Sequence, residues 1–278
     1  MVDIVGYIRF SHPARSDVRI HRQQEGPALL KAIWDPQTLD VRFACFEQFT
    51  LPSIQSQTDK DFRICVAASP RMPGAYLDRL RACTAHIPQI DLFIEDAEPD
   101  QKVHDLFDAW FAGQSPKAPG STLHFRLDDD DALSQHMIAH MRKSAAHMQV
   151  GEVFSAPNGI LAGCLDGAPS ITPHSQFFLG IGLGFLRDNA DPEVSPYRGP
   201  PHVHLSWHVP ARLSPLYPAW IRTTHRASDT QPMNDKRLRA AERVGAKLPK
   251  RHNTAKRIEK SFPFLTYDTL AAAMIELS

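Results

Sequence analysis

The chain lacks the cysteine pattern of a disulfide scaffold or of a zinc site. Its 278 residues include only four cysteines, Cys45, Cys65, Cys83 and Cys164, and no two of them form a C-x-x-C pair. Three of the four fall inside apolar runs, as buried free thiols do. This pattern indicates a protein of a reducing compartment.

Long hydrophobic runs and an excess of one charge are also missing. No stretch approaches the roughly 18 uninterrupted apolar residues of a membrane-spanning helix, and the first apolar run is too short for a signal peptide. The 31 acidic side chains balance the 31 basic ones, so the net charge indicates no particular partner. We therefore expect a cytoplasmic protein.

Strand-like and helix-like segments alternate through the first 150 residues. Apolar, β-rich runs predict strands over 4–10, 62–68, 90–94 and 121–127, and helical spacing between them predicts helices over 40–54, 76–84 and 103–111. This alternation predicts an α/β fold, with a mostly parallel sheet flanked by helices. The dinucleotide-binding motif G-x-G-x-x-G is absent from the first strand–helix junction.

The pattern becomes less regular after residue 130. A helix is predicted over 134–148, with Ser134 as its N-cap, and a strand over 152–155. The Asn158-Gly159 dipeptide predicts a hairpin turn that leads into 160–162. Residues 187–218, rich in proline and histidine, predict little regular structure.

A basic and mainly helical extension, 233–278, follows a predicted domain over 1–232. Residues 236–260 hold ten Lys or Arg against two Glu, which gives a charge of +8. The segment is either a solvated helix face or a peripheral contact with an anionic membrane, at the inner face of that membrane. Aromatic side chains for base stacking are missing until Phe262, so we expect no nucleic acid partner.

Four consecutive aspartates, Asp128 to Asp131, end the predicted strand over 121–127. Like charges in a row repel one another, and Asp is depleted in strands. A hard divalent cation such as Mn²⁺ or Mg²⁺ would neutralise them, although an acidic turn or a helix N-cap is the alternative. Since residues i and i+2 of an extended segment face the same side, Asp128 and Asp130 can both face a ligand.

Two segments of the chain resemble those of a known enzyme class. Residues 51–66, LPSIQSQTDKDFRICV, resemble a helix–turn–strand unit of inverting, nucleotide-sugar-dependent glycosyltransferases with the A-type fold. Residues 127–133, LDDDDAL, match the layout of the D-x-D-D element of those enzymes. More narrowly, over about residues 4–230, the chain is similar to a bacterial family named putative rhamnosyltransferases.

The resemblance implies a metal-dependent transferase with an A-type glycosyltransferase domain. Such an enzyme moves a sugar, rhamnose by the family's name, from a nucleotide-sugar donor to a glycan or glycolipid acceptor. It implies Asp128 and Asp130 as ligands of Mn²⁺ or Mg²⁺ and His225 as a third ligand. Residues expected near the donor are Arg9, Phe10, Ser69, Arg126 and Asp129.

Two of these positions leave alternatives open. Ser69 stands where those enzymes usually carry an aspartate that contacts the base or the ribose, so the recognition of the base is open. Arg126 is either a donor contact or a buried partner of the aspartates.

The general base that deprotonates an acceptor hydroxyl is less well defined. Asp188, His202 and His204 lie in the region that an acceptor would approach, and neutral imidazole suits the role at pH 7. A solvent-exposed loop is the alternative for each of them.

Two other functions fit the same residues. A phosphoester hydrolase could combine the aspartates with His202, His204 and His225 in a mixed carboxylate–imidazole metal site. A glycan-binding scaffold without catalysis is the other alternative, in which Ser69 reports the loss of activity.

Overall fold

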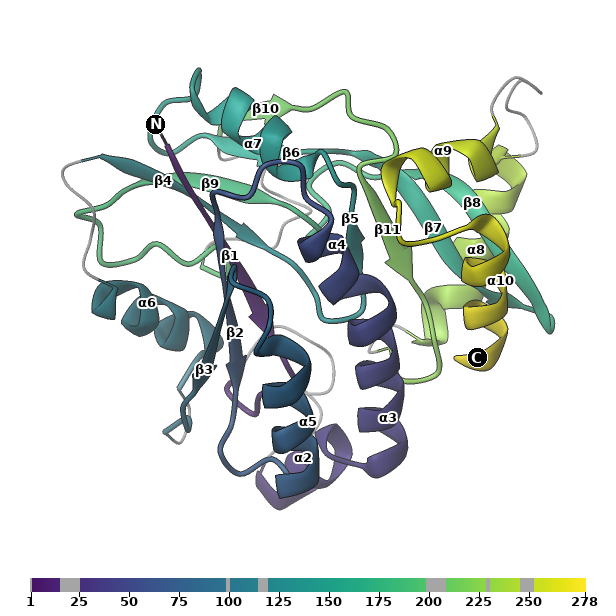
Figure 1. Cartoon of the computed structure of the whole chain (residues 1–278), viewed down its shortest axis with the longest axis horizontal. Coiled ribbons are helices and arrows are strands. Elements are labelled where there is room, and N and C mark those ends of the chain that lie inside the picture. Colours follow the sequence, from purple (N-terminus) through teal and green to yellow (C-terminus); the bar gives the residue numbers. More distant parts are fainter. Residues whose placement is uncertain are drawn as a thin grey trace.

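Two β-sheets, each covered by helices, form the framework of the protein (Figure 1). The structure is a computed structural model, and it describes residues 2–15, 26–98, 101–114, 120–198, 209–228, 231–245 and 253–278. Of residues 231–234 it describes the backbone alone.

The larger sheet holds the strands that the sequence predicts. Its strands are β1 (Asp3–Arg9), β2 (Arg63–Ala68), β3 (Ile90–Ile94), β4 (Ser121–Arg126), β6 (Val153–Ser155), β9 (Gly184–Asp188) and β10 (Ala211–Leu213). Their order is β10–β6–β9–β4–β1–β2–β3. The strands β1 to β4 are mutually parallel, whereas β9 is antiparallel to both β4 and β6. The predicted α/β fold with a mostly parallel sheet is therefore confirmed.

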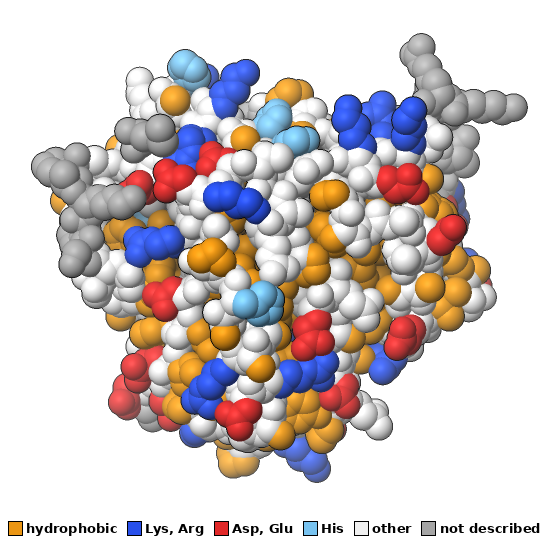
Figure 2. Space-filling view, viewed as in Figure 1, with side chains coloured by type: hydrophobic (Ala, Val, Ile, Leu, Met, Phe, Trp, Pro, Cys, Tyr) orange, Lys and Arg blue, Asp and Glu red, His pale blue; other side chains and the backbone are white. Residues whose placement is uncertain are grey.

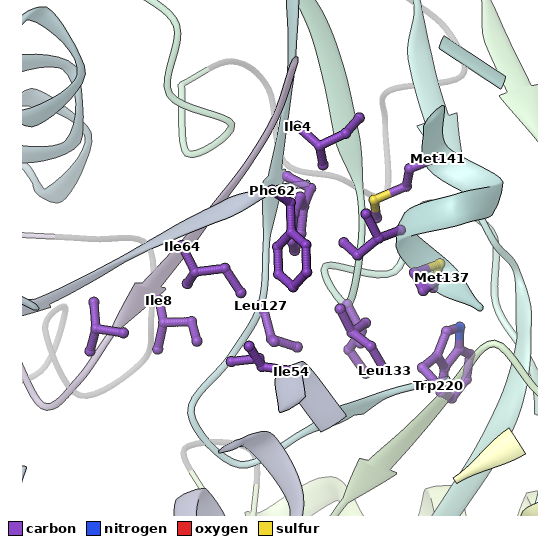
Figure 3. Packing of buried hydrophobic residues seen from close by; sticks show 14 of the residues in the cluster. Ile4, Ile8, Ile54, Phe62, Ile64, Leu127, Leu133, Met137, Met141 and Trp220 are labelled. Carbon is purple, nitrogen blue, oxygen red and sulfur yellow. The ribbon is translucent and has the colours of Figure 1, made fainter. Parts of the chain in front are cut away.

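Helices cover both faces of this sheet. They are α2 (Gly26–Ile33), α3 (Pro36–Cys45), the π-helical turn η1 (Phe46–Thr50), α4 (Leu51–Gln55), α5 (Gly74–Thr84), α6 (Val103–Gly113) and α7 (Met137–Ala145). Side chains of β1 show why both faces are apolar: Ile4 and Ile8 belong to the cluster drawn in Figure 3, whereas Val5 and Tyr7 pack with α6. Successive side chains of a strand point to opposite faces, so a covered sheet requires a continuous apolar run.

The smaller sheet has four strands among the described residues. They are β5 (Ala132–Leu133), β7 (Asn158–Leu165), β8 (Ala168–Ser175) and β11 (Trp220–Thr223), in the order β5–β11–β7–β8. Only residues 127–131 separate β4 of the larger sheet from β5 of the smaller one. The four aspartates therefore lie where the chain crosses from one sheet to the other.

The C-terminal extension is helical in its described parts, as predicted. The helices are α8 (Gln231–Gly245), α9 (Thr254–Ser261) and α10 (Tyr267–Glu276). On one face of the smaller sheet, α8 packs against β7 and β8; on the other, Phe262 and Leu270 share a buried cluster with Ile160 and Ile221. A division into domains 1–232 and 233–278 stays a prediction.

Two predictions of local structure are wrong. Asn158 and Gly159 do not form a hairpin turn, because both lie within β7 and pair with β8. The turn lies instead at Asp166 and Gly167, whose φ angles of 53° and 79° suit an Asp-Gly hairpin. Ser134 is not an N-cap either, since α7 begins at Met137.

All four cysteines are free thiols. Within the described ranges, no helix combines the length and the apolar character that crossing a bilayer requires.

Candidate active site

The four aspartates lie at the carboxyl end of β4, in the middle of the larger sheet. Leu127, just before them, donates its backbone N–H to the carbonyl of Tyr7 in β1 at 3.0 Å, so the ends of both strands lie together. Ligands of α/β sheets bind outside the carboxyl ends of the strands. A ligand site is therefore expected at this edge of the sheet.

Exposure alternates along the four residues, although residues 129 and 130 form a turn between β4 and β5 rather than an extended segment. The side chains of Asp128 and Asp130 are 42% and 18% exposed, whereas Asp129 and Asp131 are both 3% exposed. Two carboxylates thus face outward and two face inward.

Each carboxylate has its own partner. Arg126 lies 3.2 Å from Asp128, and Nη1 of Arg42 in α3 donates to both oxygens of Asp129, at 2.8 and 3.0 Å. This partly buried arginine provides the opposite charge that a buried aspartate requires.

The other two carboxylates are held by the end of β11. Nε2 of His225 lies 3.0 Å from Oδ2 of Asp130, and Asp131 accepts the backbone N–H of Thr223 at 3.0 Å. The Thr223 hydroxyl donates to the Asp130 carbonyl at 2.6 Å, and the Thr50 hydroxyl donates to the Asp131 carbonyl at 2.9 Å. Residues 130 and 131 are therefore fixed by both backbone and side chain.

These surroundings shift the pKa values of the aspartates in different directions. Burial raises the pKa of Asp129 to about 6, against the opposing charge of Arg42. Burial and the neighbouring Asp130 likewise raise the pKa of Asp131. Burial alone would raise the pKa of Asp130 too, but the hydrogen bond and charge of His225 outweigh it and lower that pKa. Asp130 thus remains ionised in a setting that protonates its neighbours more readily.

Two of the four carboxylates are placed to bind a hard cation. Asp128 and Asp130 offer outward-facing oxygens, and Mg²⁺ commonly binds one or two carboxylates together with water and substrate phosphates. No three His, Cys, Asp or Glu side chains within the described ranges are arranged to hold a metal ion. The side chain of His225 is fully buried, and its Nε2 forms a hydrogen bond with Asp130. In this structure His225 is therefore the partner of a predicted metal ligand. A ligand role for His225 itself stays a prediction.

Of the residues expected near the donor, some lie at the edge with the aspartates and one lies in the core. Arg126 is a partner of Asp128, and its guanidinium lies 4.6 Å from the ring centre of Tyr197, a residue that the sequence did not single out. Arg9 ends β1 at the same edge. The ring of Phe10 is fully buried against Phe43 and Phe46, so its side chain belongs to the core, and the expectation of a donor contact by this ring is corrected.

Ser69 is buried at the end of β2 and has an acidic neighbour. Its hydroxyl lies 3.4 Å from Oδ1 of Asp96, which also accepts from Nε of Arg71 at 2.9 Å. Asp96 follows β3, the next strand of the sheet, and is 44% exposed. The carboxylate missing at position 69 is therefore present next to it, supplied by a strand 27 residues further on.

The candidates for the general base have different outcomes. Asp188 pairs with Ser121, the first residue of β4, whereas the aspartates follow the last one. With about 3.3 Å per residue, Asp188 lies about 20 Å from the site, so its assignment as the base is wrong. His202 and His204 lie outside the described residues.

Two solved structures are distantly similar to the chain. A Bacillus anthracis structure titled a putative glucose-1-phosphate thymidylyltransferase, in complex with a sucrose, is 9% identical; the similarity covers 88% of this chain and 96% of that one, with a TM-score of 0.38. Residues 1–349 of S. aureus TarS in complex with UDP are 10% identical, with 93% and 70% covered and a TM-score of 0.38.

Sequence comparison is more decisive for the family. No curated protein matches the chain. The family model described as "Putative rhamnosyl transferase" matches residues 3–237, which include both β-sheets and the four aspartates. The chain belongs to this family of putative rhamnosyl transferases.

Proposed function

We propose that this glycosyltransferase moves a sugar, rhamnose by the family's description, from a nucleotide-sugar donor to a glycan or glycolipid acceptor with inversion, and that it requires Mn²⁺ or Mg²⁺. The observation that supports the proposal best is the pair of outward-facing carboxylates, Asp128 and Asp130, at the carboxyl end of β4. Family membership supports transfer of a sugar over phosphoester hydrolysis and over a non-catalytic scaffold.

The chemistry of the donor explains why these carboxylates are needed. Negative charge accumulates on the departing diphosphate as the glycosidic bond breaks, and a bound divalent cation would stabilise that charge as a Lewis acid. Asp128 and Asp130 would hold the cation. His225 keeps Asp130 ionised and oriented, and Arg42 keeps Asp129 turned inward. These partners fix the two outward carboxylates before a donor binds.

We also propose that Asp96 supplies the contact with the base that Ser69 cannot make. Asp96 follows β3, where Arg71 and Ser69 orient its carboxylate and leave it partly exposed. A carboxylate accepts hydrogen bonds only, so it suits a base that presents a ring N–H. Uracil, thymine and guanine present such a group.

A peripheral membrane contact of the extension is a further part of the proposal. Helix α9 exposes Lys256, Arg257 and Lys260, while Ile258 anchors its other side in the core. Figure 2 shows Lys and Arg side chains gathered where α9 lies in Figure 1. Each basic residue near an anionic bilayer contributes about 1 kcal/mol. Such a contact would place the enzyme at the cytoplasmic face, where a glycolipid acceptor is accessible.

The test compares Asp130→Asn with Asp188→Asn. In a thermal-shift assay the wild-type chain is expected to be stabilised by a nucleoside diphosphate only when Mn²⁺ is present. Asp130→Asn should lose this stabilisation and lower donor hydrolysis or transfer by about a hundredfold or more. Asp188→Asn should keep both, because Asp188 of β9 lies beside Ser121, at the opposite end of β4 from the aspartates.

Circular dichroism of Asp130→Asn checks that the variant folds. Full activity of this variant, or of the wild type in excess EDTA, would contradict the metal role. Stabilisation by nucleotide and Mn²⁺ without hydrolysis or transfer of any donor would instead indicate a scaffold.

A further inference from the structure

The face of the smaller sheet that lies under α8 carries polar and cationic side chains. Arg222 of β11 stands opposite Leu161 of β7, which stands opposite Thr172 of β8. Side chains at matched positions of neighbouring strands point to the same face. Leu161 packs against Leu238 and Ala241 of α8, so this is the face under that helix.

Two further cationic or titratable groups enter the same space. His174 lies two residues beyond Thr172 on the same face, and its ring centre is 6.1 Å from that of Trp220, two residues before Arg222. Arg237 directly precedes Leu238, which anchors α8 to the sheet. The β8–α8 cluster consists of Arg222, Arg237, His174 and Thr172.

The β8–α8 cluster holds buried hydrogen-bonding atoms that have no partner within the described part of the chain. Nη1 of Arg237 and Oγ1 of Thr172 are both in this state. Burial and the charge of Arg222 lower the pKa of Arg237, and burial and both arginines lower the pKa of His174, against a hydrogen bond with Gln176. Unpaired buried donors and clustered like charges are both costly, and an anion would relieve both.

A neighbour on the same helix shows the contrast. Arg239, two residues after Arg237, pairs with Asp166 at 2.8 Å on the surface. Nη1 of Arg237, by contrast, has no partner among the described residues. Thr223, the residue after Arg222, bonds both Asp130 and Asp131, so the Arg222 end of the cluster lies beside the four aspartates.

We propose that the β8–α8 cluster binds a phosphate or diphosphate group carried by the acceptor substrate. Guanidinium groups with a neighbouring hydroxyl match the geometry and charge of a phosphate. The donor is expected at the ends of β1, β2 and β4 in the larger sheet, whereas this cluster belongs to the smaller sheet beyond Asp130. The assignment to the acceptor rests on the proposed transferase function; the anion site itself does not.

Inorganic pyrophosphate is the probe, and calorimetric titration in EDTA is the measurement. Without a divalent cation the aspartates offer no attraction to an anion, so binding in EDTA reports the cationic cluster. The full-length chain should bind pyrophosphate, and Arg237→Gln should weaken the affinity by about tenfold or more. Arg237→Lys should retain part of it, and Arg239→Gln should equal the wild type.

Two further measurements separate this site from a structural role and from the donor site. Arg237→Gln should unfold at the same temperature as the wild type or a higher one without pyrophosphate, because a half-buried guanidinium whose Nη1 has no described partner is removed. It should also bind nucleoside diphosphate with Mn²⁺ as the wild type does.

Each contrary result has a distinct meaning. Equal pyrophosphate affinity of Arg237→Gln and Arg239→Gln, or no binding by the wild type, overturns the anion site. A matching loss of nucleoside diphosphate affinity in Arg237→Gln overturns the assignment to the acceptor. If the wild type binds pyrophosphate in EDTA but no nucleoside diphosphate with Mn²⁺, the anion site is supported and the proposed transferase function fails.

Discussion

Individual residues resolve the repulsion among the four aspartates by giving each one a different partner. Asp129 and Asp131 are inside, where Arg42 and a backbone N–H satisfy them. The cost of burying a carboxylate therefore applies to Asp129 and Asp131, whereas the side chains of Asp128 and Asp130 stay partly exposed. Removing Arg42 would leave a buried charge without a counter-charge, which is among the most destabilising single changes in proteins.

A buried histidine makes stability depend on pH. Burial lowers the pKa of His124 from 6.5 to about 3 in the folded chain, where Nδ1 hydrogen-bonds the Tyr7 hydroxyl at 2.7 Å. Between pH 6.5 and about 3 the unfolded chain therefore binds more protons than the folded chain. The contribution of His124 to stability is complete above pH 6.5 and falls by about 1.4 kcal/mol for each pH unit below it.

Urea denaturation at several pH values between 4.5 and 7 measures this dependence. In His124→Gln the free energy of unfolding should fall less steeply as the pH is lowered, by about 1.4 kcal/mol per pH unit. His86→Gln, at an exposed position, is the control and should keep the wild-type slope. Identical slopes in all three proteins would show that His124 takes up its proton equally in the folded and unfolded chains.

The sequence predicts those features of the site that depend on local geometry. The outward position of Asp128 and Asp130 agrees with the prediction, but residues 129 and 130 form a turn, so their partners and not a strand pleat set this alternation. Arg42 and Asp96 were not predicted as partners, because 87 and 27 residues separate them from Asp129 and Ser69. Only the sheet order and the helix packing bring such residues together, and no local pattern encodes that arrangement.

The strands β7 and β11 approach each other closely at Gly159. A Cβ atom added to Gly159 of β7 would lie 2.2 Å from the ring of Trp220, which is fully buried in β11. The same dipeptide, Asn158-Gly159, predicted a turn, because turns and close backbone approach both select glycine. The sequence cannot distinguish these two uses; the contact with Trp220 does.

Gly159→Ala should therefore destabilise the protein by about 2–3 kcal/mol, since the indole ring has no room to move in a packed core. Gly74→Ala is the matched control. Gly74 is the first residue of α5 and has open space around its Cα, so alanine should be neutral or slightly stabilising there. Chemical denaturation of the two variants measures the difference. Equal stability would mean that the strands β7 and β11 separate easily.

At the scale of the whole molecule, the C-terminal helices and the transferase body share a core. Ile258, Phe262 and Met274 pack in one cluster with Val41 and Phe49, which lie on the same helical run as Arg42. The family match ends at residue 237, within α8, yet the buried cluster continues to Leu277. Packing thus joins parts of the chain that a sequence boundary at residue 232 separates.

This shared core predicts that residues 1–232 do not fold alone. Removing 233–278 would expose Phe49, Ile160 and Ile221, and each fully buried apolar side chain contributes about 1.5–3 kcal/mol. The loss approaches the whole stability of about 5–15 kcal/mol that a domain has. Phe262→Ala gives a milder test and should cost about 3–5 kcal/mol over the entire chain in one transition, whereas the exposed Ile275→Ala should cost little. A truncated chain of residues 1–232 that unfolds cooperatively and still binds nucleoside diphosphate with Mn²⁺ would show instead that the extension is a separate domain.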